Sequence, residues 1–433
     1  MYQVLSIQMA RSFGESSEFV TKRVCFSSLF CAGFLCVLGG FFLGRFAAER
    51  PTAIQAKKTK LELAGNGLES IGHIQDVLIR QLAEASIQDF QSGSSEEETQ
   101  KVKNILNGLG IIRNVFKNES YVVGKVQGSR ESDRYIVLSV DKDNSEIVLE
   151  LARIFDKIHK DYNWKLRRTI VFCFFFGSSD VCHEVLPNYI RSKILAYIAV
   201  RGKAIQVNER LVASGSDIVL STVLQAIKLI ENPITESAAA NGKKTIFDTY
   251  EDTNRIVSLS RLKLDIPHVI LSFMGFKNTS RNETNHTGNV IAHRRALAQI
   301  IGLSVWRFSE STILYWNPEI LNKTVNQALD SLYIPALLNI KDTVSKSIHN
   351  LTQNAENLNK KINTMERSKP LEVRMINDLL MDLDRALLCP DTNFNSKTDL
   401  YMLHTYVQGR SIETHLKELL NCYNLVNQLL QDK

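Results

Sequence analysis

The feature that most constrains this chain is a run of twenty residues with no charged side chain, residues 24–43. At about 1.5 Å per residue, a helix of this length spans roughly 30 Å, which matches the hydrocarbon core of a bilayer. A soluble helix needs a polar face, and this run has none. The sequence therefore predicts one transmembrane helix over residues 24–44. A cleaved signal peptide is the alternative, but the run is long for one and Arg45 spoils the cleavage site.

The residues around this segment leave its orientation open. More basic residues follow the segment than precede it, and this excess mildly favours a cytosolic C-terminal side. However, long domains can be translocated regardless of flanking charge. Six N-x-S/T sequons lie after the segment, and they permit a lumenal, glycosylated C-terminal domain. Our prediction is a type II signal-anchor glycoprotein, with residues 1–23 as a cytosolic tail and the C-terminal domain extracellular or lumenal. The candidate glycosylation sites are Asn118, Asn278, Asn282, Asn285, Asn322 and Asn350.

Composition narrows the class of protein further. Of the 433 residues, 44% are hydrophobic and 23% are charged, which is typical of a globular protein. The net charge of +6 is not concentrated in a basic block, so no nucleic-acid partner is expected. The cysteines form no C-x-x-C pair, which disfavours a structural zinc knuckle. Cys173, Cys182, Cys389 and Cys422 could pair in an oxidising compartment, although their spacing does not fix the pairs. We interpret Cys173, in an apolar strand, as a packed core thiol.

The pattern of apolar residues divides the rest of the chain. Residues 45–115 are predicted to form a helical stalk, with a capping box at Ser95 and Glu98 that starts its second helix. The next region, residues 116–288, alternates strands with helices, which favours an α/β layered sheet. Its run at 169–176 is continuously apolar, as expected of a strand covered on both faces. The predicted strands are 121–126, 134–140, 169–176, 194–200 and 267–273, and the predicted helices are 147–159, 185–191 and 218–230.

The final region, residues 289–433, has helical periodicity almost throughout. Its predicted helices are 289–308, 325–365 with a break near Pro335, 371–388 and 411–431. These helices carry apolar faces that a partner would need to cover. We therefore expect this region to mediate homodimerisation.

Several motifs carry a resemblance to a known family. Residues 133–140 (DRYIVLSV), 164–172 (WKLRRTIVF), 265–273 (DIPHVILSF) and 371–388 (LEVRMINDLLMDLDRALL) stand in the order and spacing of the glutamate carboxypeptidase II and transferrin receptor family. The resemblance spans about 118–390 and is closest to the inactive N-acetylated-alpha-linked acidic dipeptidase-like branch. It implies an M28-peptidase-like layered sheet with flanking helices, followed by a helical dimerisation domain. It also implies an apical domain before the core, but only a few residues separate Gly110 from the first core strand.

The resemblance further implies a two-zinc site, and most of its positions hold other residues here. Asp141 stands at the position of the first histidine ligand, and Arg201 stands at an aspartate ligand. Ser178 and Ser179 replace the acidic pair that supplies the general base and a ligand. The glycine-rich ligand loop is missing because a helix begins near residue 145. His286 is the nearest candidate for the last histidine ligand, and we interpret it as an exposed loop residue.

These replacements oppose metal binding. A serine hydroxyl is neither a good ligand for a divalent cation nor a general base at neutral pH. An arginine cannot ligate a cation, and its fixed charge repels one. Asp141 and Asp143 are interpreted as an acidic turn or as helix N-cap residues. The sequence therefore predicts no catalytic residue, no metal ligand and no cofactor. It favours an inactive, membrane-anchored dimeric scaffold or receptor-like ectodomain whose protein or peptide ligand is unknown.

Two alternatives remain open at the sequence level. One is a metallo-exopeptidase of the acidic-dipeptidase type, with zinc in a rearranged site around Asp141, Asp143, Asp180, His183 and Glu184. The other is a shortened gene product that lacks the apical domain and the ligand loop. A serine nucleophile is disfavoured because residues 177–181 (GSSDV) lack the second glycine of the G-x-S-x-G pattern.

Overall fold

The computed structural model describes ten segments of the chain, in two units that comprise residues 1–69 and 70–433. In the first unit, residues 29–40 are helical and expose large apolar side chains such as Phe30 and Val37. The rest of the predicted transmembrane segment lies outside the described residues. Among the described helices, none is both long and apolar enough to cross a membrane. The described residues are 29–40, 66–87, 93–177, 182–202, 209–230, 266–275, 286–330, 334–367, 369–389 and 412–431.

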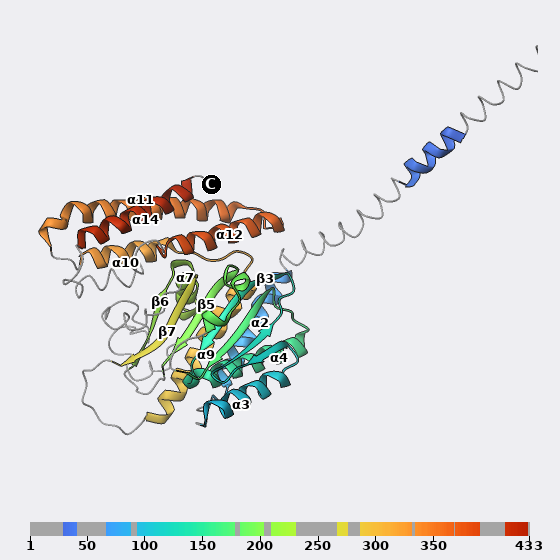
Figure 1. Cartoon of the computed structure of the whole chain (residues 1–433), viewed down its shortest axis with the longest axis horizontal. Coiled ribbons are helices and arrows are strands. Elements are labelled where there is room, and N and C mark those ends of the chain that lie inside the picture. The colour runs from blue at the N-terminus through green and yellow to red at the C-terminus, as the bar shows by residue number, and fades with distance from the viewer. Residues whose placement is uncertain are drawn as a thin grey trace, which may run out of the picture. The chain divides into compact units, whose positions relative to one another are not determined.

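A seven-stranded sheet forms the centre of the second unit (Figure 1). Its order is β1-β2-β4-β3-β5-β7-β6. The four central strands β4, β3, β5 and β7 are parallel, and the pairs at both edges are antiparallel. The strands are β1 (Ile112–Lys117), β2 (Tyr121–Val126), β3 (Glu131–Val140), β4 (Arg168–Phe175), β5 (Ile194–Arg201), β6 (Glu209–Gly215) and β7 (His268–Gly275).

The central strands explain the layered architecture. Every residue of β4 is buried, as expected of a parallel strand covered on both faces. Separate clusters of buried apolar side chains cover the two faces, with Phe172 in the larger cluster and Val171 in the smaller. The predicted α/β layered sheet and its five predicted strands are confirmed. The edge strands β1 and β6 were not predicted.

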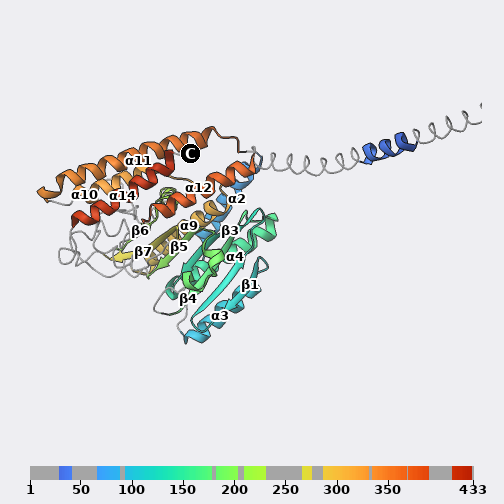
Figure 2. The ribbon, with the colours of Figure 1, turned by 45° about the horizontal axis from the view of Figure 1, so that its top comes forward.

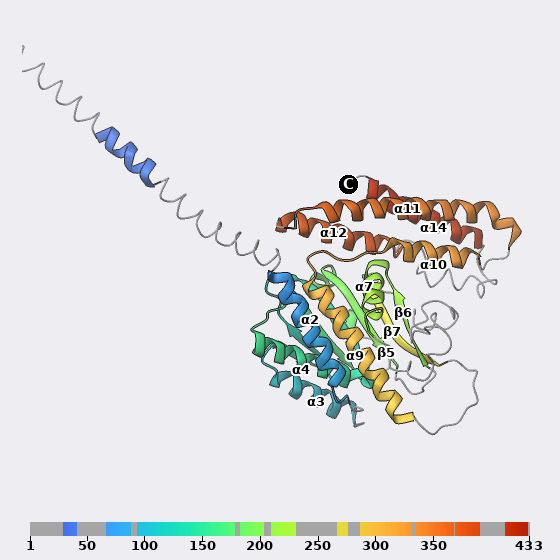
Figure 3. The same ribbon diagram turned by 180° about the vertical axis from the view of Figure 1, so that it is seen from behind.

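Helices cover the larger cluster on one face of the sheet. Figure 3 shows α2 and α9 side by side on this face, with α3 and α4 beside them. Gly302 permits the close approach of α9 to α2, because a Cβ atom there would lie 2.4 Å from Cδ1 of Leu82. The helices of this face are α2 (Asn66–Glu84), α3 (Ser95–Gly108), α4 (Ser145–Tyr162), α7 (Asp217–Ile227) and α9 (His286–Glu310).

This arrangement corrects the predicted stalk. Leu78 and Leu82 of α2 and Leu106 of α3 are fully buried in the core that covers the sheet. The described residues 70–87 and 93–115 therefore belong to the α/β unit and form no separate stalk. The capping box of α3 also lies one residue earlier than predicted, at Ser94 and Glu97. α3 ends at Gly108 and β1 begins at Ile112, so no apical domain intervenes.

The opposite face carries two short helices in place of the single predicted one, α5 (Cys182–Val185) and α6 (Asn188–Arg191). Cys182 forms a disulfide with Cys173 of β4, which corrects the interpretation of Cys173 as a packed thiol. In the sequence, Ser178 and Ser179 lie between these two cysteines. Those two serines lie outside the described residues.

The C-terminal helices form a layer beside the sheet (Figures 1 and 2). Its members are α10 (Pro318–Asp330), α11 (Leu338–Thr364), α12 (Pro370–Ala386) and α14 (Ile412–Gln431). Leu351 of α11 and Leu419 and Tyr423 of α14 are fully buried, so these helices cover much of each other's apolar surface. The predicted break near Pro335 is confirmed, because Pro335 begins a short 3₁₀ turn before α11. A second disulfide joins Cys389, after α12, to Cys422 of α14.

Candidate functional site

Three central strands end side by side at the carboxyl edge of the sheet. Val140 of β3 is in register with Phe174 of β4 and with Val200 of β5. The residues that follow these positions, Asp141, Phe175 and Arg201, therefore meet at one edge. Open sheets of parallel strands bind ligands at this edge, which makes it the candidate site.

Asp141 is engaged by hydrogen bonds from the protein itself. It is the N-cap of the 3₁₀ turn η1 (Lys142–Asn144), and its Oδ1 accepts from the backbone N–H (3.2 Å) and from Nδ2 (2.7 Å) of Asn144. Its Oδ2 accepts from the N–H of Gly202 at 2.7 Å. Gly202 has a φ of 75°, in the left-handed region that favours glycine. The predicted N-cap role is confirmed, and the carboxylate links the turn after β3 to the turn after β5.

The electrostatics of Asp141 reflect this setting. Burial raises the pKa of Asp141, although the hydrogen bonds from Gly202 and Asn144 and the charge of Arg201 act in the opposite direction. Asn144 reinforces the link, because its Nδ2 also donates to the carbonyl of Gly202 at 2.8 Å. Three hydrogen bonds from the protein occupy three of the roughly four lone-pair sites of the Asp141 carboxylate.

Arg201 places a fixed positive charge at the same edge. Its guanidinium carbon lies 4.4 Å from the centre of the Phe175 ring, a cation–π arrangement. Its Nη1 donates to the carbonyl of Val200 at 3.0 Å, and its Nη2 donates to Oγ of Ser139 at 3.4 Å. The side chain is thus held against the strand ends, beside Asp141.

The described residues at this edge do not form a two-zinc centre. A zinc site needs three or more nitrogen, sulfur or carboxylate ligands, and no such group of His, Cys, Asp and Glu occurs among the described residues. Among the described residues, Asp141 is the carboxylate that hydrogen bonds hold at this edge, and it lies close to the guanidinium group of Arg201. Asp143 is exposed on the next turn.

The other predicted site residues are not brought to this edge by any described contact. Ser178, Ser179 and Asp180 lie outside the described residues, and so does the side chain of His286, the first residue of α9. His183 and Glu184 are neighbours on α5, with a separation of 3.7 Å between Nε2 and Oε1. No described contact therefore brings His183 and Glu184 to Asp141.

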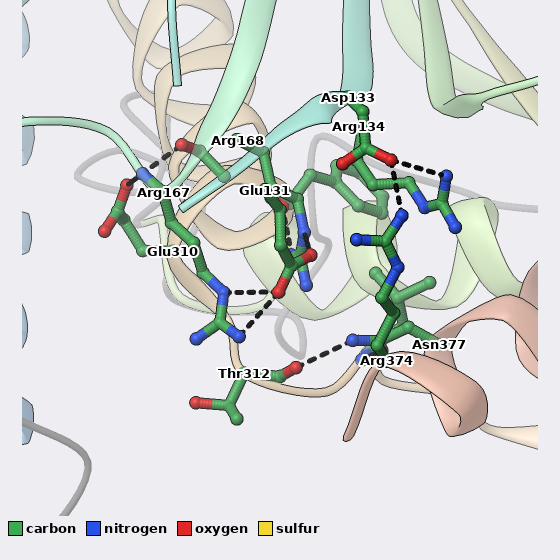
Figure 4. Close-up of polar contacts among 12 residues, drawn as sticks. Glu131, Asp133, Arg134, Arg167, Arg168, Glu310, Thr312, Arg374 and Asn377 are labelled. Atoms are coloured by element: carbon green, nitrogen blue, oxygen red, sulfur yellow. Dashed lines mark hydrogen bonds and ion pairs between the residues drawn. The ribbon is translucent and has the colours of Figure 1, made fainter. Parts of the chain in front are cut away.

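The amino edge of the sheet holds a buried ion network that the sequence did not predict (Figure 4). Glu131 of β3 accepts from Nε of Arg167 at 2.7 Å and from Nε of Arg168 at 2.8 Å. Arg168 is fully buried, and its Nη1 also donates to the carbonyl of Phe308 at 2.6 Å. Burial alone would raise the pKa of Glu131, but the guanidinium groups of Arg168 and Arg167 hold it below its usual value.

Further contacts at the same edge attach the neighbouring helices α9 and α12. Glu310, at the end of α9, accepts from the backbone N–H of Arg167 at 2.9 Å, and its burial raises its pKa. Asp133 pairs with Arg374 of α12, and Arg134 pairs with Asp378 of the same helix (Figure 4 shows the Asp133 contacts). The charged residues of the DRY and RR motifs therefore attach α12 and α9 to the amino edge. They are structural contacts at the end of the sheet opposite Asp141.

Comparison with known proteins gives the following relatives. Aminopeptidase NAALADL1 of Rattus norvegicus is 25% identical over 335 residues, which is 64% of this chain and 44% of the relative. The probable glutamate carboxypeptidase LAMP1 of Arabidopsis thaliana is 24% identical over 323 residues, 65% of this chain and 46% of the relative. The chain thus spans less than half the length of these relatives. No family model matches the chain.

Among solved structures, the LapA aminopeptidase of Legionella pneumophila is similar over 59% of this chain and 74% of its own chain. The sequence identity is 12% and the TM-score is 0.32.

Proposed function

Because the chain is a homologue of M28-type peptidases of the glutamate carboxypeptidase and NAALADL1 kind, we propose that it is a catalytically inactive member that serves as a scaffold or receptor-like ectodomain. One observation carries the proposal. At the carboxyl edge of the sheet, Arg201 lies against Phe175, and the carboxylate of Asp141 is bound by Gly202 and Asn144. A guanidinium group in this place repels a divalent cation, and it offers no lone pair to bind one.

The test is an activity assay of the purified full-length protein with added zinc. The substrates are aminoacyl anilides, which suit an aminopeptidase, and peptides with a C-terminal glutamate, which suit a glutamate carboxypeptidase. The expected result is no zinc-dependent hydrolysis. Zinc-dependent turnover that is lost in Asp141→Ala would instead support the alternative, a metallo-exopeptidase with a rearranged site.

The proposal includes a type II membrane location with the C-terminal domain in the lumen or outside the cell. The Cys173–Cys182 and Cys389–Cys422 disulfides support it, because structural disulfides persist mainly in oxidising compartments. The sequon asparagines Asn118 and Asn350 support it as well, since both are exposed and accessible to a glycan. Contact with the bilayer through residues 24–43 is supported by the exposed apolar side chains of residues 29–40.

We predict that endoglycosidase treatment of the protein from eukaryotic cells increases its gel mobility. Mutating Asn118 and Asn350 to glutamine should remove part of that shift.

The two disulfides give a second prediction. Alkylation before reduction should leave Cys173, Cys182, Cys389 and Cys422 unlabelled. Full labelling of all four cysteines in freshly lysed cells would contradict the proposed compartment.

The proposal also includes a homodimer formed through the C-terminal helices. Large apolar side chains remain exposed on this layer, including Leu371 and Met375 of α12 and Leu425 and Leu429 of α14. The two residues on each helix are four positions apart and so share one helix face, and contiguous apolar surface can serve as an interaction site. Chemical crosslinking of the full-length protein should give a dimer, and changing Leu425 and Leu429 to glutamate should abolish it. A protein that crosslinks only as a monomer would contradict this part of the proposal.

A further inference from the structure

A small cavity lies on the helix-covered face of the sheet, away from the edge that holds Asp141. Its volume is about 210 Å³. The residues that line it come from three helices and from the segment after α9. They include Gln75 of α2, Gln225 of α7, Arg307 of α9, and Ser311 and Tyr315 beyond α9. Because Arg307 is in the last turn of α9, near the Glu310–Arg167 contact, the cavity lies toward the amino edge of the sheet.

Arg307 is the charged group of this cavity. It is half-buried, and its Nη1 donates to Oε1 of Gln225. Among the described residues, no carboxylate lies within 4.0 Å of its guanidinium group. Burial lowers the pKa of Arg307, while the nearby Tyr315 acts in the opposite direction. The dipole of α9 offsets part of the charge at the helix C-terminus, but this effect is modest and a guanidinium group still gains from an anionic partner.

The other polar groups of the cavity suit an anion. Gln225 uses its carbonyl oxygen toward Arg307, which leaves its Nε2 as a donor. Ser311 and Tyr315 add hydroxyl donors, and Gln75 adds a side-chain amide. The hydroxyl of Thr222 is already used, since it donates to backbone carbonyls. Among its described lining residues, the cavity therefore combines one cation with several neutral donors and has no acidic side chain.

The size of the cavity limits the occupant. It exceeds the space that a single water molecule needs, and it is smaller than the roughly 300–1,000 Å³ pockets that hold drug-sized ligands. We propose that this cavity is a binding site for a small oxyanion, either free phosphate or the carboxylate of an amino-acid-sized molecule, with Arg307 as its principal contact.

Isothermal titration of the full-length protein tests the proposal with three probes. Inorganic phosphate and succinate represent the two sources of oxyanion, and succinamide is the neutral control. The expected result is saturable binding of phosphate, succinate or both at one site per chain, with none for succinamide. Tighter binding of phosphate would identify a phosphate site, and tighter binding of succinate would identify a carboxylate site.

Variants separate this site from general surface charge. Arg307→Gln should weaken binding about tenfold or more, because it removes a charge-assisted hydrogen bond. Tyr315→Phe should weaken it by a smaller factor. Because Tyr315 is 42% exposed, this variant is expected to fold even if Arg307→Gln does not. Arg113→Gln removes the same charge from an exposed position on β1 and should bind as the wild type does.

The proposal is overturned by any of three results. The first is the absence of saturable binding for both anions up to about 10 mM. The second is unchanged binding in folded Arg307→Gln, or in Tyr315→Phe if the arginine variant does not fold. The third is an equal loss of binding in Arg113→Gln.

Discussion

Replacement of Glu131 by alanine is expected to lower the free energy of unfolding by about 3–5 kcal/mol, the cost of removing one partner of a buried ion pair. Glu131 is the carboxylate that contacts both Arg167 and Arg168. Without it, the fully buried guanidinium of Arg168 would have no carboxylate in contact among the described residues. The measurement is urea-induced unfolding of the wild type and the variant at about pH 7, followed by circular dichroism.

A matched variant and the pH dependence make this prediction specific. Glu119→Ala removes an exposed carboxylate in the β1–β2 turn and should change stability by less than about 0.5 kcal/mol. Because the pKa of Glu131 is lowered in the folded protein, its contribution is present above its ordinary pKa of 4.5 and is lost as the pH falls through the folded value. The difference between the wild type and Glu131→Ala should therefore shrink in acid. If Glu131→Ala lowers the free energy of unfolding at neutral pH only slightly, or no more than Glu119→Ala does, the Glu131–Arg168 ion pair is not essential for stability.

The second large effect is expected for Asp384→Ala, at about 3–5 kcal/mol of unfolding free energy. Asp384 of α12 is buried, and it accepts hydrogen bonds from Oγ of Ser216 at 2.6 Å and from the backbone N–H of Ile218 at 2.7 Å. It thus caps the N-terminus of α7 from a distant helix, and each hydrogen bond to a charged group contributes about 1.5–3 kcal/mol. The variant should unfold at a lower urea concentration than the wild type.

The neighbouring residue Asp382 provides the control for this experiment. Its side chain is 70% exposed, and it pairs with Arg385 one turn later on α12. Exposed pairs of this kind contribute little, so Asp382→Ala should change stability by less than about 0.5–1 kcal/mol. Equal effects of the two substitutions would mean that the α12 helix, and not the cap on α7, is responsible for the loss.

The sequence predicted those elements whose apolar pattern reports their own environment. The run at 169–176 identified β4 because a strand covered on both faces is apolar throughout. The edge strand β1 was missed because most of its residues are exposed or only partly buried, which weakens the apolar signal. Periodicity also showed that α2 has an apolar face, but it could not show that Leu78 and Leu82 pack under the sheet instead of in a stalk.

The site residues also divide into those that the sequence predicted and those that it did not. Asp141 and Arg201 were located because each follows a strand that the sequence identified, and parallel strands bring such residues to one edge. Their partners could not be predicted, since the contact of Asp141 with Gly202 spans 61 residues of sequence. The pairing of Glu131 with Arg168 was missed because charged residues at a strand start normally indicate a solvent-exposed surface.

The most direct test of the central claim is the zinc content of the purified full-length protein, measured by elemental analysis after dialysis against zinc-containing buffer and then against buffer without metal. With Arg201 beside Asp141 and no three-ligand cluster among the described residues, we predict far less than one zinc per chain, with the same value in Asp141→Ala. One or more zinc ions per chain, lost in Asp141→Ala, would show that the carboxyl edge binds metal and would favour the metallo-exopeptidase.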